Sequence, residues 1–254
     1  MSAELTGQDY DEQWKRLYDF IKYNPGARHR RRLILRRLRH RSEPESVLDA
    51  GCGLGFTVKD LSTVVSPSKI TGLDFSNSAI EWARERFPDS LWITGDLSSD
   101  LTSTLGRKYD LIVCSEVIEH LPDYQTVIGN LCSLLNDEGC LIITTQAGRI
   151  HKTEMSVGHL KHFTIGEIER ILRQSGLSVL ESIAWGWPGM TAIKYAANLN
   201  SDVTIRALGS GTYGILAKAI NHVAYLFSYL LSLPNTKWGP QLLVLATKPT
   251  SDRR

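Results

Sequence analysis

Short apolar runs alternate with segments of helical periodicity along most of the chain. Seven runs have the length and composition of buried strands: Ser46–Ala50, Lys69–Asp74, Leu91–Thr94, Tyr109–Ser115, Cys140–Thr145, Leu177–Ser182 and Gln241–Thr247. Between them, apolar residues recur every three or four positions, as at Val58, Leu61 and Val65, which is typical of amphipathic helices. Strands that alternate with helices favour right-handed βαβ units, so the pattern predicts an α/β fold with a doubly wound, mostly parallel sheet.

Local signals mark where some of these helices begin and end. Two segments read as capping boxes, in which a hydroxyl and a glutamate satisfy amide donors that the helix leaves open: Ser78 with Glu81, and Thr164 with Glu167. Gly176 follows an apolar helical segment and predicts a helix end. The helices are therefore expected to begin near residues 78 and 164.

One segment is strongly basic. Residues Arg28–Arg41 read RHRRRLILRRLRHR, with Leu33, Ile34, Leu35 and Leu38 on one side of a predicted helix. Such a helix before the first strand is expected to be a solvated face, although it leaves RNA open as a partner.

A second segment, Ala219–Leu233, reads AINHVAYLFSYLLSL and is apolar on nearly every helical face. A helix of this kind must be buried against something. Polar residues and a proline interrupt the window, which is too short to cross a bilayer: Asn221, His222, Ser228, Pro234 and Asn235. We therefore predict a packed helix over an acceptor pocket, with a dimer contact or a peripheral membrane contact as alternatives.

Composition and charge narrow the class of protein. The chain has 254 residues, of which 42% are hydrophobic and 22% charged; these values are ordinary for a globular fold and exclude a disordered or collagenous protein. A net charge of +2 argues against a surface built mainly for nucleic acid. The four cysteines show neither CxxC pairing nor zinc spacing, and the first residues are too polar for a signal peptide. We expect reduced cysteines and a cytoplasmic location.

The residues after the first strand predict a ligand-binding loop. Ligands of open α/β sheets lie at the carboxyl ends of the strands. Here Asp49 is followed by Gly51, Gly53 and Gly55, which allow the backbone to turn tightly and to approach a ligand closely. The spacing is G-x-G-x-G rather than the dinucleotide fingerprint G-x-G-x-x-G.

Further acids follow the next strands. Asp74 ends the second strand, where it could accept hydrogen bonds from ribose hydroxyls, and Asp96 follows the third, where it could accept from an exocyclic amine. Together with Asp49 they suit a cationic, amine-bearing nucleoside and suit a pyrophosphate badly.

These motifs carry a family resemblance. DAGCGLG, GLDFS, GDL and YDLIVCSEVIEHLPD, in this order, resemble the successive motifs of class I S-adenosylmethionine-dependent methyltransferases. The resemblance runs from about Leu33 to Thr247. It implies a Rossmann-like, seven-stranded sheet in which the last strand, Pro240–Pro249, inserts antiparallel beside Leu177–Ser182. It also implies S-adenosylmethionine as cofactor and S-adenosylhomocysteine as product.

The resemblance further implies a role for each cofactor residue. Gly51, Gly53 and Gly55 would pass under the methionine part, Asp49 would reach its amino group, Asp74 would hold the ribose hydroxyls and Asp96 the adenine N6. Phe75 and Leu97 would flank the adenine ring, and Ser115, at the end of the fourth strand, is a further expected contact. Trp14, Tyr18 and Tyr23 could close over the cofactor.

The acceptor side offers one candidate constellation. Glu116, Glu119 and His120 are spaced i, i+3 and i+4, so a helical turn would project them to one side. The element resembles the E-x-x-E-H of the ubiquinone-biosynthesis O-methyltransferases and of the small-RNA 3′-terminal 2′-O-methyltransferases. In the second group it binds a metal, and both groups supply a further downstream histidine. His159 and His162 are candidates here, with His151 a third.

The same element also occurs in methyltransferases without a metal, where the histidine helps to build the acceptor pocket. We therefore predict no metal and expect activity to resist EDTA. The predicted catalytic residues are His162, as general base or orienting group, with His120 and Glu119. A metal held by Glu116, Glu119, His120 and His159 is the alternative.

The chain divides into a core and two additions on this interpretation. Residues 46–183 and 239–250 would form the methyltransferase core, residues 1–45 an N-terminal helical cap, and residues 184–238 a helical insertion that shapes the acceptor pocket. The insertion is rich in aromatic residues, which favours a hydrophobic or aromatic acceptor; the alternative is that the rings form a small core of two helices. They are Trp185, Trp187, Tyr195, Tyr213, Tyr225, Phe227 and Tyr229.

The predicted function is methyl transfer from S-adenosylmethionine to an oxygen or nitrogen atom of a small hydrophobic or aromatic molecule. An RNA 3′-terminal 2′-O-methyltransferase is one alternative. A nicotinamide-dependent oxidoreductase is another, disfavoured by the glycine spacing and by Asp49. A non-catalytic cofactor-binding protein is a third. The sequence leaves monomer and homodimer open.

Overall fold

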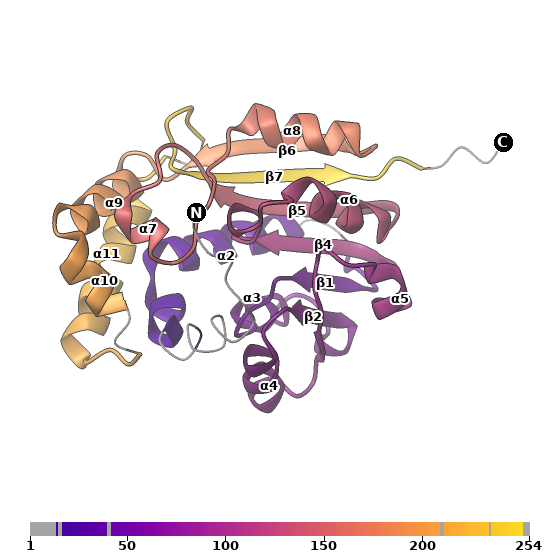
Figure 1. Ribbon diagram of the computed structural model, residues 1–254, viewed down its shortest axis with the longest axis horizontal. Helices are drawn as coiled ribbons and strands as arrows, with labels where there is room; N and C mark the ends of the chain where they lie inside the picture. The colour runs from indigo at the N-terminus through magenta and orange to yellow at the C-terminus, as the bar shows by residue number, and fades with distance from the viewer. Residues whose placement is uncertain (1–13, 15–16, 40–41, 209–210, 234, 251–254) are drawn as a thin grey trace.

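The computed structural model describes residues 14, 17–39, 42–208, 211–233 and 235–250 (Figure 1). Its centre is a seven-stranded sheet in the order β3-β2-β1-β4-β5-β7-β6. The strands are β1 (Val47–Ala50), β2 (Ile70–Asp74), β3 (Leu91–Thr94), β4 (Tyr109–Ser115), β5 (Leu135–Gln146), β6 (Ser178–Trp185) and β7 (Gln241–Thr247). Strands β1 to β5 pair in parallel, while β7 lies antiparallel between β5 and β6. The predicted α/β class and antiparallel last strand are confirmed.

Helices cover both faces of the sheet. They are α2 (Pro25–Leu38), α3 (Phe56–Leu61), α4 (Asn77–Arg86), α5 (Leu101–Leu105), α6 (Tyr124–Ser133), α7 (Lys152–Met155), α8 (Ile165–Gln174), α9 (Gly189–Leu199), α10 (Ser201–Leu208) and α11 (Ile215–Leu231), with single turns η1 (Pro67–Lys69) and η2 (Ile118–His120). One buried cluster packs α2, α3 and α4 on the sheet, and the other packs α5, α6 and α8 on the opposite face. The doubly wound arrangement is therefore confirmed.

Strand boundaries follow the apolar runs closely. The predicted ranges of β3, β4 and β7 match, whereas β5 begins at Leu135 rather than at Cys140. The extra residues include the polar stretch Asn136–Gly139, in which Glu138 adopts a φ of 64°. A Cβ on Gly139 would lie 2.8 Å from the Asn136 carbonyl oxygen, so this bend requires glycine.

One of the two predicted helix caps is wrong. Helix α4 begins two residues before Ser78 would place it, because the hydroxyl of Ser76 accepts a hydrogen bond from the Ala79 amide at 3.1 Å and caps the helix. The other box is confirmed: the Thr164 hydroxyl accepts from the Glu167 amide, and the Glu167 carboxylate accepts from the Thr164 amide. The nearer hydroxyl at residue 76 was available, so the serine at residue 78 was not needed as a cap.

Helix α2 is not simply a solvated basic face. Arg30, Arg31 and Arg37 turn inward and form ion pairs with Glu116, Asp60 and Glu181, at 3.0, 2.7 and 2.7 Å. Arg32, Arg36 and Arg39 are exposed. Three of the six arginines of α2 thus fasten the helix to the sheet domain. One of them, Arg30, reaches the carboxyl end of β4.

The segment between β6 and β7 contains α9, α10 and α11, which gather beyond the carboxyl ends of the parallel strands (Figure 1). Helix α11 packs on α2 and α9. The prediction that this helix is buried is wrong, because Ser228 is its only buried residue; its position over an acceptor pocket stays a prediction. Within the described ranges, no helix combines the length and apolar character needed to cross a membrane.

Candidate active site

The sheet has its topological switch between β1 and β4, and a loop with three glycines follows β1. Gly51, Gly53 and Gly55 have φ values of 77°, 50° and 72°, a region that residues with a Cβ adopt at a cost. The amides of Gly51 and Cys52 donate to the Leu73 carbonyl at the end of β2, at 2.8 and 3.0 Å. The loop is therefore held tightly against β2, and the side chains of Val117, Trp14 and Trp92 pack where a Cβ on the three glycines would lie.

Asp49 lies under this loop as a buried carboxyl. Its side chain is 1% exposed, and among the described residues its Oδ2 has no hydrogen-bond partner. Burial, together with repulsion from Asp74, raises the pKa of Asp49 to about 8. A buried acid of this kind gains a partner when a cation approaches. The site thus fits the ammonium group of S-adenosylmethionine.

Asp74, at the end of β2, joins the loop to α4. One carboxylate oxygen accepts from the Gly53 amide at 2.7 Å, and the other accepts from the Ser76 amide at 2.9 Å. A carboxylate oxygen accepts more than one hydrogen bond, so these two bonds are compatible with the expected contact to ribose hydroxyls. Asp74 therefore positions the glycine loop as well as the expected ribose site.

The residues expected around the adenine differ in exposure. Asp96 is exposed, and its carboxylate accepts from the amide and the hydroxyl of Ser98 at 2.8 and 2.7 Å. Leu97 is buried at 6%, whereas Phe75 is 48% exposed. The expected adenine site therefore has the exposed ring of Phe75 after β2 and the buried side chain of Leu97 after β3.

Two other expected contacts of the cofactor lie near these strand ends. The hydroxyl of Ser115 lies 2.8 Å from that of Thr144 on β5. The indole of Trp14 covers the loop, since a Cβ on Gly53 would lie 2.6 Å from its Cη2, and its buried Nε1 has no partner within the described part of the chain. Tyr18 packs on Phe56, while Tyr23 contacts His222 on α11 and so lies elsewhere.

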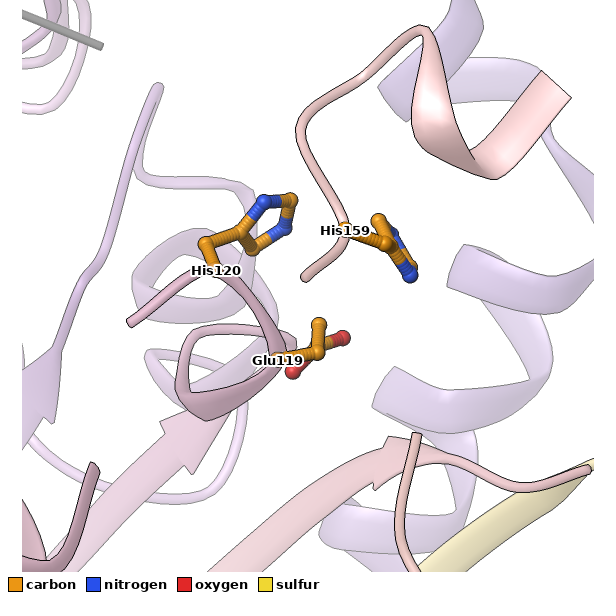
Figure 2. A group of neighbouring side chains, drawn as sticks. All are labelled: Glu119, His120 and His159. Atoms are coloured by element: carbon orange, nitrogen blue, oxygen red, sulfur yellow. The ribbon is translucent and has the colours of Figure 1, made fainter. Parts of the chain in front are cut away.

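The acceptor side is built on the turn η2, which follows β4. Glu119 is fully buried, with Oε2 accepting from the Thr145 hydroxyl at 2.9 Å. Its backbone carbonyl accepts from the Leu160 amide at 2.8 Å, which ties the loop after α7 to the turn. Figure 2 shows the result: Glu119, His120 and His159 converge, with one ligand atom of each within 4.8 Å of the others.

Burial controls the charge of this group. It raises the pKa of Glu119 well above its usual range, with repulsion from Glu116 adding to the effect. It lowers the pKa of His120 to about 4 and that of His159 to about 2. At neutral pH both histidines are therefore uncharged and each carries a lone pair.

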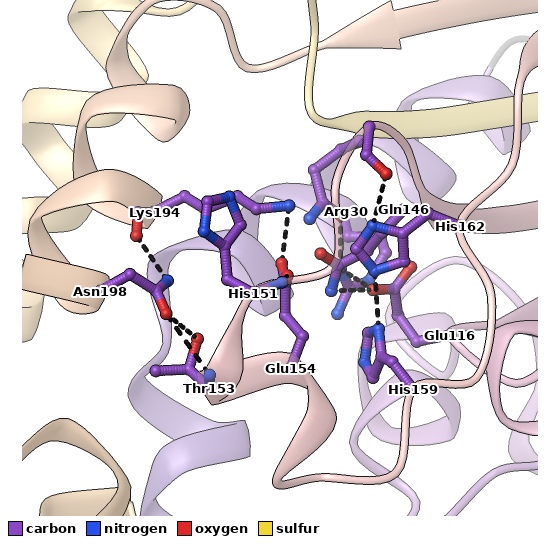
Figure 3. Close-up of polar contacts among 12 residues, drawn as sticks. Arg30, Glu116, Gln146, His151, Thr153, Glu154, His159, His162, Lys194 and Asn198 are labelled. Atoms are coloured by element: carbon purple, nitrogen blue, oxygen red, sulfur yellow. Dashed lines mark hydrogen bonds and ion pairs between the residues drawn. The ribbon is translucent and has the colours of Figure 1, made fainter. Parts of the chain in front are cut away.

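Hydrogen bonds fix which nitrogen of His159 carries its proton (Figure 3). Nδ1 of His162 lies 3.1 Å from the Gly148 carbonyl oxygen, which can only accept, so this nitrogen is protonated. Nε2 of His162 must then accept from Nδ1 of His159 at 3.0 Å. The lone pair of His159 is therefore on Nε2, and both nitrogens of His162 are engaged.

Glu116 is turned away from the other three candidate ligands. It adopts a φ of 58°, and its carboxylate pairs with Arg30 at 3.0 Å and accepts from the Gln146 amide at 3.2 Å. Arg30 also donates to the Gln241 side chain at 2.8 Å. The structure thus brings together Glu119, His120 and His159, and it binds Glu116 to α2 instead.

Sequence patterns did not reveal three of the charged groups at this end of the sheet. Besides Arg30, Lys194 on α9 pairs with Glu154 on α7 at 2.6 Å, and both side chains are almost buried (Figure 3). Nearby, the Thr153 hydroxyl donates to the Asn198 side chain at 3.0 Å. These contacts fasten the insertion to the loop that carries the histidines. Charged residues at isolated positions give no sequence signal for such pairing.

The aromatic residues of the insertion mostly pack elsewhere. Tyr225 and Tyr229 stack on His29 of α2, and Trp187 pairs with Trp238. Tyr195 is an exception, because its ring contacts His151 at 5.3 Å. The rings therefore give little direct support to a hydrophobic acceptor at the strand ends.

Comparison with known proteins gives consistent matches. A family model described as a methyltransferase domain matches residues 23–182. The chain is 27% identical over 143 residues to the malonyl-[acyl-carrier protein] O-methyltransferase of Anoxybacillus flavithermus, an alignment covering 55% of this chain and 52% of that protein. It is 30% identical over 108 residues to the ubiquinone biosynthesis O-methyltransferase of Actinobacillus pleuropneumoniae, with 40% and 45% covered. The chain spans about half the length of these curated relatives.

Solved structures share the fold. The N-methyltransferase NodS of Bradyrhizobium japonicum, in complex with S-adenosyl-L-homocysteine, matches with a TM-score of 0.58 and 20% identity, covering 90% of each chain. Phosphoethanolamine N-methyltransferase 2 of Haemonchus contortus matches with a TM-score of 0.64 and 14% identity, covering 97% of this chain and 61% of that one.

Proposed function

Because the chain belongs to the class I S-adenosylmethionine-dependent methyltransferases, we propose that it transfers a methyl group from S-adenosylmethionine to an oxygen or nitrogen atom of a small molecule. The observation that carries the proposal is the buried carboxyl of Asp49, whose Oδ2 has no partner among the described residues, beneath the loop of Gly51 and Gly53. A cationic amine is the ligand that this combination favours.

The residues around the loop divide the work of holding the cofactor. Asp49 receives the ammonium group, and the backbone from Gly51 to Gly55 lies along the methionine part. Asp74 accepts from the ribose hydroxyls, while Asp96, Leu97 and Phe75 surround the adenine. Trp14 covers the loop and keeps water away from it. When bound, S-adenosylmethionine supplies the electrophilic methyl group.

On the acceptor side, the histidines position the acceptor group. Methyl transfer from a sulfonium is an in-line displacement at the methyl carbon, so positioning the acceptor lone pair behind the S–CH3 bond is the largest requirement. Nε2 of His159 accepts a hydrogen bond from the acceptor group, and His162 keeps the imidazole in the required tautomer. Because burial lowers the pKa of His159 to about 2, this imidazole is a weak base, and it suits an acceptor that is bound in its deprotonated form, such as a neutral amine. His120 and Glu119 complete the wall of the pocket.

The same three side chains also fit a divalent cation. Glu119, His120 and His159 would be its protein ligands and would leave coordination positions open for an acceptor oxygen. The ion would then lower the pKa of the acceptor hydroxyl. An acceptor that is bound as a neutral amine or a phenolate needs no such help, so we retain the prediction of metal-independent transfer.

The alternatives drawn from the sequence fare differently. The glycine spacing and Asp49 leave no favourable place for the pyrophosphate of a nicotinamide cofactor. For an RNA acceptor, the exposed arginines of α2 are the relevant surface, but Arg32 stacks on Tyr229 of α11, away from the histidines. The hydrophobic or aromatic character of the acceptor stays a prediction.

Calorimetry with S-adenosylhomocysteine and with NAD tests the proposal. We expect binding of S-adenosylhomocysteine only. Asp74→Asn should weaken it by at least about tenfold, since a hydrogen bond to a charged group contributes about 1.5–3 kcal/mol. Asp100→Asn, on an exposed helix cap, is the matched control and should bind normally. Binding of NAD, or an unchanged affinity in Asp74→Asn, would refute the cofactor assignment.

A labelled methyl group then identifies the acceptor class. Catechols, lipid phenols, amino sugars and RNA ends would be offered with the intact protein. Label transfer to a small molecule supports the proposal, whereas transfer to RNA ends alone would replace it by the RNA alternative.

A further inference from the structure

Helix α11 turns its bulky apolar side chains away from the protein. Its inward positions are small or polar, and the closest packing occurs at the fully buried Ser228. Its outward positions include six aliphatic side chains that are between 55% and 90% exposed: Ile215, Leu216, Ile220, Val223, Leu226 and Leu230. We call this set the outer face of α11. An amphipathic helix of a globular protein normally has the opposite orientation.

Specific contacts hold α11 in this orientation. Nε2 of His29 on α2 lies 2.9 Å from the Ser228 hydroxyl and 3.3 Å from the Tyr225 carbonyl. At its end, the Ser232 hydroxyl donates to the Gly186 carbonyl at 3.1 Å. On the α9 side, a Cβ on Gly189 would lie 3.1 Å from the Ser228 Cα, so the backbones approach closely. Rotating α11 to bury its outer face would break these contacts.

An exposed aliphatic stripe of this length calls for an occupant. Each square ångström of apolar surface left in water costs about 25 cal/mol, and contiguous patches of this kind mark interaction sites. The outer face is a row along one helix of 17 residues. A ridge of this form fits a flat apolar medium better than a pocket.

The charges beside the outer face are positive. The guanidinium groups of Arg28 and Arg32 on α2 stack over the rings of Tyr225 and Tyr229, at 3.7 and 4.2 Å from the ring centroids, and Arg36 is exposed one turn further along. Neither Pro25–Leu38 nor Ile215–Leu231 contains an acidic residue.

Tryptophan and lysine border the far end of α11. The Leu233 amide donates to the Trp187 carbonyl at 2.8 Å, and the Trp187 ring lies 5.4 Å from that of Trp238. Trp238 is 61% exposed, with the Lys237 ammonium over its ring. An aliphatic face bordered by tryptophan and cations is the composition of helices that lie in a membrane interface.

We propose that the outer face of α11 docks on an anionic lipid bilayer, with the arginines of α2 against the headgroups. A second copy of the chain is a poorer occupant, because a two-fold interface through α11 would place the α2 arginines of one copy beside those of the other. The proposal does not depend on the acceptor, since a docked protein could methylate a soluble or a lipid substrate.

Sedimentation of the full chain with vesicles tests the proposal. We expect strong binding to vesicles of equal parts phosphatidylcholine and phosphatidylglycerol, and weaker binding to phosphatidylcholine alone. A triple variant, Val223→Ser with Leu226→Ser and Leu230→Ser, should lose at least about tenfold in partition to both. The matched control is Leu91→Ser with Leu180→Ser, two exposed leucines on β3 and β6 and outside the outer face of α11, which should bind as the wild type does.

A second pair of variants separates charge from hydrophobic contact. Arg32→Gln with Arg36→Gln should weaken binding to anionic vesicles by about 25-fold, since each surface cation contributes about fivefold, and should leave binding to phosphatidylcholine unchanged. Arg107→Gln with Lys108→Gln, which also removes two exposed cations, should have little effect. Unchanged thermal unfolding and S-adenosylhomocysteine affinity would show that the variants are folded.

Three outcomes would overturn the proposal. The first is a wild-type protein that does not sediment with anionic vesicles. The second is a triple variant that binds as the wild type does. The third is analytical ultracentrifugation in which the wild type is a dimer and the triple variant a monomer, which would assign the outer face of α11 to a second copy.

Discussion

Nδ1 of His159 donates a hydrogen bond to Nε2 of His162 over 3.0 Å. His162 in turn donates to the Gly148 carbonyl, so two successive bonds orient one lone pair. The histidine expected from the sequence to act as base is thus placed to orient its neighbour, and the residue noted only as a candidate metal ligand carries the available nitrogen.

This relay predicts unequal effects of substitution. His159→Gln should lower kcat by about 10²-fold, the usual cost of a misplaced acceptor. His162→Gln should lower kcat less, because a glutamine amide can still accept from His159. Steady-state kinetics with an identified acceptor measures both, with His151→Gln as the control variant. A larger loss in His162→Gln than in His159→Gln would refute the assignment.

The same burial predicts an unusual pH profile. Desolvation lowers the pKa of His159 to about 2 and of His120 to about 4, so both stay deprotonated as pH falls below 6.5. We expect kcat to remain level from pH 8 to about 5 instead of falling near pH 6.5 as for an exposed histidine. A profile of kcat against pH checks this, and a single inflection near 6.5 would contradict it.

Cofactor binding should release a proton through Asp49. Its carboxyl has a pKa raised to about 8 by burial, so it is mostly protonated at pH 7 until an ammonium group arrives. We expect release of up to about one proton per S-adenosylhomocysteine bound, measured as a dependence of the calorimetric enthalpy on the ionisation enthalpy of the buffer. Asp49→Asn should remove this dependence and weaken binding. Binding without proton release would show that this carboxyl is already ionised or is not used.

Chelation tests the role of Glu119, His120 and His159. We expect turnover to survive EDTA, because a neutral amine or a phenolate needs no ion to provide its lone pair. The measurement is initial rate before and after EDTA, with Mg²⁺ and Zn²⁺ added back separately. Loss of turnover that either ion restores, together with loss of ion binding in His120→Gln, would establish a metal centre in place of the metal-free arrangement.

A buried histidine at the α2–α11 contact predicts acid sensitivity. Burial lowers the pKa of His29 to about 4, against a hydrogen bond to the Tyr225 carbonyl that raises it, and Arg32 and Arg28 lower it further. The unfolded chain binds this proton from pH 6.5 downward, so stability is lost between pH 6.5 and 4. Denaturation at several pH values should show wild type losing about 2–3 kcal/mol more than His29→Gln over this interval. Parallel losses in both proteins would contradict the prediction.

Most of the sheet could be predicted from the sequence because its strands are buried on both faces and read as continuous apolar runs. The boundary of β5 could not, since Asn136–Gly139 is polar and forms an irregularity between the pairs Leu135–Tyr109 and Cys140–Leu111. Local rules also failed where two serines competed to cap α4. In each case a neighbouring element decided between two chemically acceptable choices.

The candidate site was predictable where residues follow strand ends and unpredictable where long side chains reach across. Arg30 is one of eight arginines in Arg28–Arg41, and only the packing of α2 selects it to meet Glu116. The orientation of α11 could not be predicted either, because its sequence is apolar on nearly every helical face. Its inward side is determined by the contact between Ser228 and His29, which the sequence does not reveal.

The position of β7 bears on how the protein is made. It is the last strand along the chain but lies between β5 and β6, and it pairs with both over most of its length. Until it emerges from the ribosome, β6 has no neighbour in the sheet, and the exposed edges of β5 and β6 are open to pairing with other chains. A stop codon before Gln241 should therefore cause aggregation during synthesis, even though the residues that hold the cofactor would all be present.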